Sequence, residues 1–263
     1  MSAPTKAHAE RSYVSHAWAL IRTSVTGLVA PPSAPRRAEA AERLQQQLLW
    51  LAVIGAAGVI VLMFGFDATE ISMMPKRGDP SLWTARVLTD FGNDTYVLWA
   101  LVAALVAVAI FGPLLQGASR TRLLHLGTHL QYMLLALLLP ILFAEGIKWV
   151  VGRGRPFVGG KPNPFNFVPF TGTEAYFSFP SNHSVTAFAL AFAVSAVWPR
   201  VRIVMFVYAV AIAATRLVLL AHHPSDVVGG AMIGLIGAIA VRYYFAARQL
   251  GFGIAENGKI VPL

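Results

Sequence analysis

The chain has 263 residues, of which 56% are hydrophobic and only 13% are charged, and it carries a net charge of +9 without any cysteine. Its apolar residues gather into long blocks, which is typical of a polytopic membrane protein, and the absence of cysteine excludes disulfides and thiolate chemistry. The basic residues are spread over short segments between these blocks, so the charge does not indicate a nucleic-acid-binding protein.

Residues 1–46 are predicted to form a cytoplasmic N-terminal segment. They contain no apolar core of about 7–15 residues followed by small residues, so we expect no cleavable signal peptide. Apolar residues recur at helical spacing from Tyr13 to Leu28, and Pro31 and Pro32 end the pattern. This spacing predicts an amphipathic helix that lies either on the cytoplasmic membrane surface or against the spans.

Six apolar runs follow, and each is a candidate transmembrane helix. They cover residues 47–66, 96–115, 130–147, 184–198, 203–221 and 227–241. A helix needs about 20 residues to cross a bilayer. The runs at 184–198 and 227–241 are shorter, so we expect their helices to begin inside the polar segments before them. The predicted fold is an all-α bundle of six transmembrane helices over residues 47–247, followed by a cytoplasmic tail over residues 248–263.

The distribution of Lys and Arg indicates the orientation of this bundle. With six spans both termini lie on one side, which carries thirteen Lys and Arg residues against eight on the other side. Basic residues are in excess on the cytoplasmic side of membrane proteins. We therefore expect both termini in the cytoplasm and, for a bacterial inner-membrane protein, the opposite helix ends in the periplasm.

Local patterns predict two further features. Asp79 and Pro80 are typical of a helix start, and the apolar residues from Leu82 to Phe91 predict a second surface helix that ends at Gly92. Close helix packing is predicted at two pairs of small residues, Gly55 with Gly58 and Gly230 with Gly234.

Polar residues of chemical interest form three clusters. The first closes the third span, where Lys148 is followed after six residues by Arg155 and Pro156. A lysine that ends a span is commonly an interfacial anchor, and Arg153 and Arg155 have an ordinary explanation as loop charges. This cluster alone therefore does not indicate a site.

The second cluster, Pro180 to His183, precedes the fourth span. A serine cap such as Ser181 leaves backbone N–H groups of the following helix free to bind an anion, and His183 adds a titratable proton donor. An ordinary helix cap beside an interfacial histidine is the alternative interpretation.

The third cluster begins near the end of the fifth span with Thr215 and Arg216 and continues with His222, His223 and Asp226. An arginine inside an apolar run is costly unless it faces a cavity or a partner. Asp226, four residues after His222, is placed to accept the imidazole N–H and to orient that ring for attack.

The six-span topology brings all three clusters to the same membrane face. Together they supply three cations, backbone donors, a hydroxyl, and two histidines with a carboxylate. These groups are sufficient for phosphoryl transfer without a metal, because they stabilise the phosphate charge and carry the proton.

The clusters resemble the signature of the type 2 phosphatidic acid phosphatase family: Lys, six residues, Arg-Pro; then Pro-Ser-Gly-His; then Ser-Arg, five residues, His, three residues, Asp. The spacing agrees at Lys148, Arg155, Pro156, Pro180, Ser181, His183, Arg216, His222 and Asp226. Asn182 stands where the family has glycine, and Thr215 where it has serine. Asparagine tolerates left-handed backbone geometry and threonine keeps a hydroxyl, so we expect function to survive.

The resemblance implies a membrane lipid phosphatase related to vanadium haloperoxidases and bacterial acid phosphatases, with a phosphohistidine intermediate. The implied phosphate-binding residues are Lys148, Arg155, Ser181, Asn182 and Arg216. The implied catalytic residues are His222 as nucleophile, His183 as acid and base, and Asp226 as the group that orients His222. The resemblance implies no metal and no other cofactor.

The substrate and the reaction type stay open within this class. Isoprenyl diphosphate, phosphatidic acid, phosphatidylglycerophosphate and phosphorylated lipid A are all candidates, because headgroup choice depends on loop shape. Transfer of phosphate to an acceptor is one alternative to hydrolysis. A non-catalytic phospholipid-binding or transport protein is another, although every expected catalytic side chain is present. The sequence does not indicate an oligomeric state.

Aromatic residues are concentrated in the connection between residues 157 and 179. They are Phe157, Phe165, Phe167, Phe170, Tyr176, Phe177 and Phe179. They are predicted either to line a lipid entrance near the headgroups or to form an interfacial aromatic belt.

Overall fold

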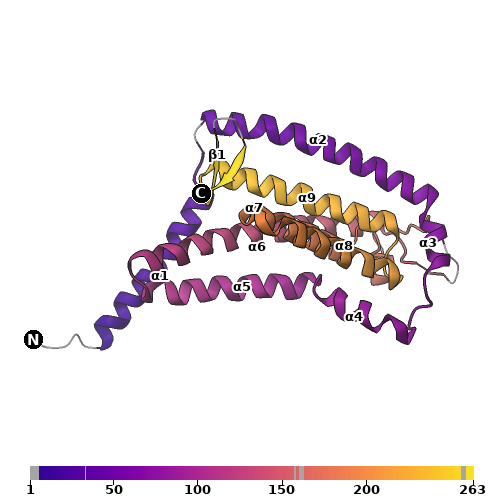
Figure 1. The fold of residues 1–263 in the computed structure, drawn as a ribbon, viewed down its shortest axis with the longest axis horizontal. Helices are drawn as coiled ribbons and strands as arrows, with labels where there is room; N and C mark the ends of the chain where they lie inside the picture. The colour runs from indigo at the N-terminus through magenta and orange to yellow at the C-terminus, as the bar shows by residue number, and fades with distance from the viewer. Residues whose placement is uncertain (1–5, 33, 157, 160–162, 256–258) are drawn as a thin grey trace, which may run out of the picture.

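The computed structural model describes residues 6–32, 34–156, 158–159, 163–255 and 259–263, and shows an elongated helical bundle with a small C-terminal hairpin (Figure 1). The α-helices are α1 (Lys6–Val29), α2 (Ala34–Gly65), α3 (Asp67–Met73), α4 (Trp83–Asp90), α5 (Asp94–Phe111), α6 (Gly117–Val151), α7 (Asn182–Val197), α8 (Arg202–Val218) and α9 (Pro224–Ala247). The 3-10 helices are η1 (Pro80–Leu82), η2 (Gly112–Leu114), η3 (Glu174–Tyr176) and η4 (Pro199–Val201). Strands β1 (Phe252–Ile254) and β2 (Ile260–Pro262) pair antiparallel.

Each predicted span corresponds to a helix. In the described chain, five helical stretches are long and apolar enough to cross a membrane: they include α2 from Leu44 onward and the whole of α5, α6, α8 and α9. Helix α7, at the predicted fourth span, is a shorter apolar helix of 16 residues. Helices α7 and α9 begin at Asn182 and Pro224, inside the polar motifs, as expected. The third span needs correction, because α6 begins at Gly117 instead of Leu130, and its hydrogen-bonded backbone continues through polar residues before the apolar run.

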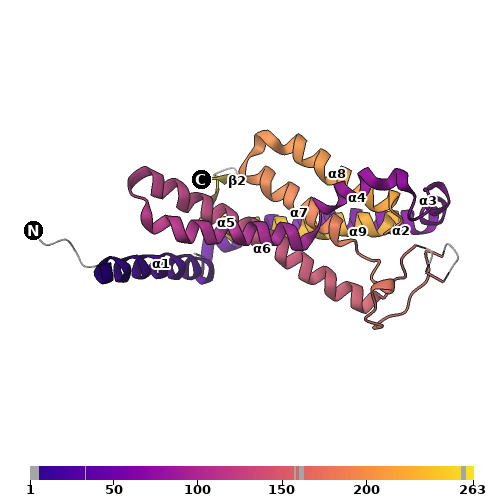
Figure 2. The ribbon, with the colours of Figure 1, turned by 90° about the horizontal axis from the view of Figure 1, so that it is seen from below.

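The terminal segments lie together at one end of the bundle. Helix α1 and the hairpin lie at the end opposite α3 and α4 in both ribbon views (Figures 1 and 2). The Tyr244 hydroxyl donates to the Leu28 carbonyl at 2.6 Å. The ring of Tyr132 packs edge-on against Phe245 and Phe252, with centroid distances of 5.6 and 4.8 Å. These contacts anchor both terminal segments to the helices that lead to the opposite end.

Helix α9 packs closely against its neighbours because its glycines leave room for them. A Cβ on Gly230 would lie 2.4 Å from the Ser181 carbonyl oxygen, and one on Gly234 would lie 2.4 Å from the Val185 carbonyl oxygen. On α2, Gly55 allows a similarly close approach to the side chain of Met232 on α9. The predicted packing role of the small residues is confirmed at these positions.

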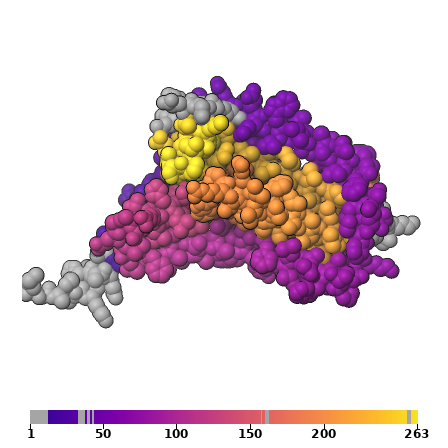
Figure 3. Space-filling model, in the orientation of Figure 1, coloured from indigo at the N-terminus to yellow at the C-terminus, as the bar shows by residue number. Residues whose placement is uncertain are grey.

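The outward surface of the bundle is apolar. Ile54 and Phe64 on α2, and Ile203 and Phe206 on α8, have between 63% and 75% of their surface exposed. Figure 3 shows α8 on the outer surface of the bundle. Large apolar side chains pointing outward along whole helices are what a lipid environment requires.

Both predicted surface helices are present as helices. On α1, Val14 and Trp18 from the predicted apolar face are exposed. At the other end, the Asp79 carboxylate accepts a hydrogen bond from the Ser81 backbone at 2.9 Å, and Pro80 takes the first helical position of η1, which continues into α4. The start signal of this second helix was therefore correctly predicted.

A left-handed glycine turns the chain from α6 into the connection that leads to α7. Gly152 has φ +55°, and a Cβ there would lie 2.0 Å from the Val168 carbonyl oxygen. The Gly152 carbonyl accepts a hydrogen bond from the Val168 backbone at 2.7 Å, and Arg153 forms a β-bridge with Phe167. Only glycine fits this turn, which directs the following basic residues back over the end of the bundle.

Candidate active site

The three predicted clusters meet at the end of the bundle that carries α3 and α4 (Figures 1 and 2). Lys148 lies in the last turn of α6, Ser181 caps α7, and Arg216 lies in the last turn of α8. The Ser181 backbone N–H donates to the Asp226 carbonyl at 3.1 Å, which ties the second cluster to the third. The expected convergence is present.

Two basic side chains are buried at this end and have protein partners. Lys148 and Arg216 are 7% and 8% exposed. Lys148 Nζ donates to Glu145 Oε1 at 2.8 Å, one turn earlier on α6. Arg216 Nη1 donates to Thr89 Oγ1 of α4 at 2.7 Å. Each cation is therefore held in place from one side, which leaves its remaining N–H groups for another acceptor.

Several donors at this end have no acceptor within the described chain. Ser181 Oγ, Arg155 Nε and Arg216 Nε are buried and unpartnered. Ser181 takes the predicted cap position of α7, but its hydroxyl makes no capping hydrogen bond. Arg155 Nη2 lies 3.6 Å from the exposed carboxylate of Glu174. A hydroxyl and two guanidinium N–H groups without protein acceptors are groups that a phosphate would satisfy.

His222 is buried, and its hydrogen bond sets its tautomer. Its Nδ1 lies 2.7 Å from the Ser178 carbonyl oxygen, which can only accept, so Nδ1 carries the proton and Nε2 keeps the lone pair. Burial, and then the positive charge of Arg216, hold the pKa of His222 well below its ordinary value. The ring is therefore neutral near pH 7. His183, in the first turn of α7, lies near the positive charges of Arg216, Lys148 and Arg155.

The expected hydrogen bond from His222 to Asp226 requires correction. His222 Nδ1 lies 3.9 Å from Asp226 Oδ2. That oxygen instead accepts from Ser178 Oγ at 2.6 Å, from the His223 backbone at 2.8 Å and from His223 Nδ1 at 3.0 Å. The reason is local: His223 is the cap of α9 and Asp226 its third residue, so the two form a reciprocal capping box. Asp226 is therefore linked to His222 indirectly, because Ser178 donates its hydroxyl to Asp226 and accepts from His222 Nδ1 with its carbonyl.

Asn182 is also accommodated differently from the expectation. It is the first residue of α7 and is not among the residues with positive φ, so the left-handed tolerance of asparagine is not used. Its side-chain amide donates to Asp94 Oδ2 of α5 at 3.2 Å and to Glu145 Oε1 of α6. The residue at the family's glycine position thus joins the start of α7 to two neighbouring helices.

Three charged residues of this end were missed as site residues. Glu145 bonds both Lys148 and Asn182, while Arg153 and Asp67 form a buried ion pair at 2.8 Å. Glu145 carried a sequence signal, because it is an acid inside a predicted span. Arg153 was interpreted as a loop charge, and Asp67 directly follows a span, where an acid is unremarkable. In the described chain, no group of three His, Asp or Glu side chains could hold a metal ion.

The aromatic connection lies largely on the surface. Phe165, Phe167 and Phe170 have between 40% and 57% of their surface exposed. Phe170 packs edge-on against Trp149 of α6 with a centroid distance of 4.7 Å. Phe157 lies outside the described residues. Exposed rings at the connection between α6 and α7 fit both predicted roles, a lipid entrance and an interfacial belt.

Known proteins that resemble this chain were found by a family model, by sequence and by structure. A family model described as the PAP2 superfamily matches residues 129–250. A lipid A 1-phosphatase of Rhizobium johnstonii is 30% identical over 201 residues, which cover 76% of this chain and 82% of the relative. A lipid A 1-phosphatase of Rhizobium etli is 30% identical over 173 residues, which cover 65% of this chain and 75% of the relative. A crystal structure of a PAP2-type phosphatidylglycerolphosphate phosphatase from Bacillus subtilis is 20% identical with a TM-score of 0.39, and the match covers 86% of this chain and 94% of that one.

Proposed function

Because the chain belongs to the PAP2 superfamily and is a membrane lipid phosphatase, we propose that it hydrolyses a lipid phosphate through a covalent intermediate on His222. One observation carries this proposal. Unpartnered donors of Ser181, Arg155 and Arg216 are buried beside a neutral, oriented imidazole. Phosphate charge would be stabilised by these groups and by Lys148 while the imidazole attacks.

In the first step, Nε2 of His222 attacks phosphorus and the bond between phosphorus and the lipid oxygen breaks. The negative charge of the bound phosphate offsets the neighbouring cations, so His183 carries a second proton, and it gives this proton to the leaving oxygen. In the second step, His183 takes a proton from water, the water oxygen attacks phosphorus, and the bond between phosphorus and Nε2 breaks. Inorganic phosphate leaves and His222 is restored.

In this proposal Asp226 orients His222 through Ser178, which lies in the connection between α6 and α7. Its Oδ2 accepts from Ser178 Oγ, and the Ser178 carbonyl accepts the proton on Nδ1 of His222. As positive charge develops on the ring during attack, the nearby carboxylate stabilises it, since 3.9 Å separates His222 Nδ1 from Asp226 Oδ2. His223 is the cap of α9 and takes no part in the bond-making steps.

Asn182 is proposed to shape the phosphate site indirectly. Its side chain holds Glu145, which in turn holds Lys148. The start of α7 is thereby fixed relative to the phosphate-binding lysine. The backbone N–H groups of this first turn remain available to the phosphate, since they have no partners within the helix.

For the substrate, we propose the phosphate of a lipid A-type molecule. Both curated relatives described above carry the name lipid A 1-phosphatase, and the first aligns over 82% of its own length. Isoprenyl diphosphate, phosphatidic acid and phosphatidylglycerophosphate are the competing substrates.

We place the site on the periplasmic face of a bacterial inner membrane, with both termini cytoplasmic. The support is the distribution of Lys and Arg, with thirteen on the terminal side and eight on the other. In the fold, α1 and the C-terminal hairpin lie at the end opposite the site (Figure 1). Residues 47–247 would form the catalytic membrane domain, with residues 1–46 and 248–263 on the cytoplasmic side.

The test is phosphate release from the four lipids by purified protein in detergent with excess chelator. Release from the lipid A substrate is expected, with an acid-labile phosphoenzyme. His222→Ala should abolish both, while His223→Ala should keep substantial activity, because only His222 is positioned by the Ser178 carbonyl. Binding without release from any lipid would favour a binding protein, and phosphorylation of an added acceptor would favour a transferase. Loss with chelator that divalent metal restores would contradict the metal-free mechanism.

A further inference from the structure

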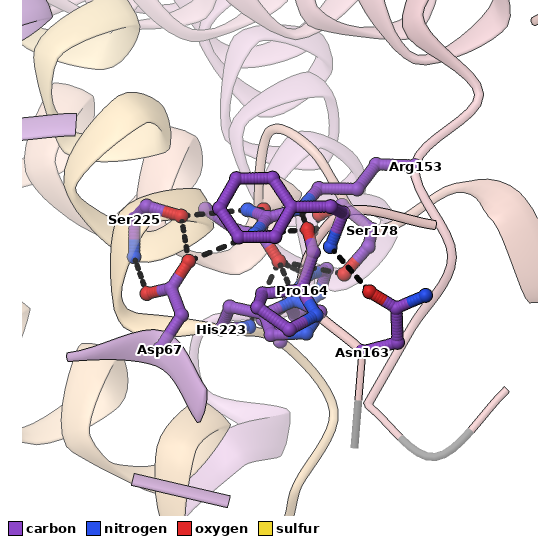
Figure 4. A network of polar contacts seen from close by, with 10 residues as sticks. Asp67, Arg153, Asn163, Pro164, Ser178, His223 and Ser225 are labelled. Carbon is purple, nitrogen blue, oxygen red and sulfur yellow. Dashed lines mark hydrogen bonds and ion pairs between the residues drawn. The ribbon is translucent and has the colours of Figure 1, made fainter. Parts of the chain in front are cut away.

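Asp67 is a fully buried carboxylate outside all three phosphatase motifs. It is the first residue of α3, directly after the first long span. Its Oδ2 accepts from Arg153 Nη2 at 2.8 Å and from the Ser225 hydroxyl, and its Oδ1 accepts from the Ser225 backbone at 3.0 Å. Figure 4 shows Asp67 facing Ser225 at the start of α9, beside the Arg153 side chain. The side-chain hydrogen bonds of this buried acid go to Arg153 and to Ser225, the residue before Asp226. A buried carboxylate in such a polar network is a candidate for a role in positioning the site.

Arg153 connects this acid to the catalytic acid. It is 1% exposed, and both of its Nη atoms and its Nε have protein acceptors. Nη1 donates to Asp226 Oδ1 at 2.5 Å, while Nε and Nη2 donate to the Pro164 carbonyl at 3.0 and 2.8 Å. Arg155 and Arg216, in contrast, each keep a buried N–H without an acceptor. All three guanidinium nitrogens of Arg153 therefore donate to acceptors within the protein, and we do not assign this residue as a phosphate ligand.

The hydrogen bonds continue from Asp226 to the nucleophile. Arg153 holds Asp226 through Oδ1, which leaves Oδ2 for the Ser178 hydroxyl. The Ser178 backbone N–H also donates to the Arg153 carbonyl at 3.0 Å, and the Ser178 carbonyl bonds His222 Nδ1. Each link in the series from Asp67 to His222 is a hydrogen bond between buried groups.

We propose that Asp67 is a positioning residue for the nucleophile, an inference that rests on the proposed role of His222. Asp67 fixes the guanidinium of Arg153, and Arg153 fixes Asp226 and the backbone of Ser178. Asp226 and Ser178 in turn set the orientation of the His222 ring. The helix α3 therefore contributes to catalysis without touching substrate.

The reason lies in how two carboxylates share one guanidinium. With Asp67 on one side and Asp226 on the other, Arg153 is held between opposing attractions. In an Asp67→Asn variant Arg153 Nη2 loses its charged acceptor, so the guanidinium is held less firmly on that side and can move. Asp226 and the Ser178 loop then shift with it, which turns His222 out of line with phosphorus.

The experiment compares Asp67→Asn with wild type in detergent, using the full chain and the lipid substrate that wild type hydrolyses. We expect kcat to fall by about 10²-fold, the loss that a misplacement of about 1 Å produces, with KM nearly unchanged. Rapid-quench measurements should show slower formation of the phosphoenzyme and little change in its breakdown, because breakdown depends on His183 and water. Ser72→Ala is the matched control, since Ser72 lies on α3, is exposed, and among the described residues bonds only the Thr69 carbonyl.

A purely structural role for Asp67 would give a different pattern. An unchanged kcat, or a reduction that follows only the loss of folded protein, would overturn the proposal. If Asp67→Asn does not fold, Asp67→Glu keeps the buried charge and displaces the carboxylate by one methylene. Wild-type kcat in folded Asp67→Glu would then overturn it. If wild type itself forms no phosphohistidine, the proposed function fails instead, so the two failures are distinguishable.

Discussion

Adding a single methyl group at Gly230 tests whether the approach of α9 to the start of α7 sets the geometry of the site. A Cβ at this position would lie 2.4 Å from the Ser181 carbonyl oxygen and 3.0 Å from Ser184 Cβ, whereas ordinary contact begins at 3.4 Å. The obstructing atom belongs to the backbone, so it cannot rotate away. In Gly230→Ala the two segments must therefore separate by about 1 Å, which moves Ser181 and His183 relative to His222.

A displacement of about 1 Å in a catalytic arrangement lowers turnover by about 10²-fold. The overpacking itself is expected to cost about 1–3 kcal/mol of folding free energy. The assay is kcat for lipid phosphate release, measured together with the thermal unfolding midpoint in the same detergent. We expect the kcat of Gly230→Ala to fall while most of the protein remains folded at the assay temperature.

Gly146→Ala is the matched control, because a Cβ on this α6 glycine would meet nothing within 4 Å. Alanine in a helix interior is favoured over glycine by about 0.5–1 kcal/mol, so this variant should be at least as stable as wild type and fully active. Folded Gly230→Ala with a kcat within about twofold of wild type would refute the reasoning, since each factor of ten in rate corresponds to about 1.4 kcal/mol of activation free energy.

Three further predictions concern the acid–base group, a buried acid and the topology. With a substrate that has a good leaving group, His183→Ala should form the phosphoenzyme but break it down slowly for lack of a base, and rapid breakdown in a quench assay would contradict the role assigned to His183. Burial, and then the charge of Asp67, raise the pKa of Glu70 from 4.5 to about 7, and neither carboxylate oxygen of Glu70 has a partner in the described chain. Because the pKa of Glu70 is higher in the folded than in the unfolded state, ionisation of this carboxyl lowers the free energy of unfolding as pH rises from 4.5 to about 7. Glu70→Gln removes this cost, so its free energy of unfolding should exceed that of wild type by about 3 kcal/mol at pH 8 and by much less at pH 5. A pH-independent gain in thermal melts, or a similar gain for the exposed Glu42→Gln, would contradict this account. Lys76→Cys, an exposed position in a chain without cysteine, should react with an impermeant reagent added outside the cell, and labelling only from the cytoplasm would overturn the topology.

Among the motif residues, Arg216 has a position that the sequence by itself marks as chemically costly. Arg216 stands in an apolar run, where a cation needs a partner or a cavity, and the structure provides Thr89 on one side and an unpartnered N–H on the other. Chain topology then brings Lys148 and Ser181 to the same end, since successive spans cross the membrane in alternating directions. The convergence of the clusters follows from the order of the spans.

The contacts of Asp226 could not be predicted in the same way. The family spacing favours His222 over His223 as the nucleophile, but which of the two rings contacts Asp226 depends on where α9 begins. Because His223 is the helix cap, it takes the carboxylate of Asp226, and His222 is left to the Ser178 carbonyl from a separate segment. A one-residue shift in a helix boundary decides this contact, and local sequence does not specify boundaries to that accuracy.

By itself the sequence determined the membrane character of the chain, the approximate helices, and the residue types that meet at one end, because hydropathy and chain order act through local and additive effects. Only the tertiary structure decided that Arg153 lies between Asp67 and Asp226, and that Asn182 reaches Glu145. These pairs join residues far apart in the chain. Their hydrogen bonds depend on side-chain positions that the packing of several helices sets together, and the sequence near each residue carries no record of its partner.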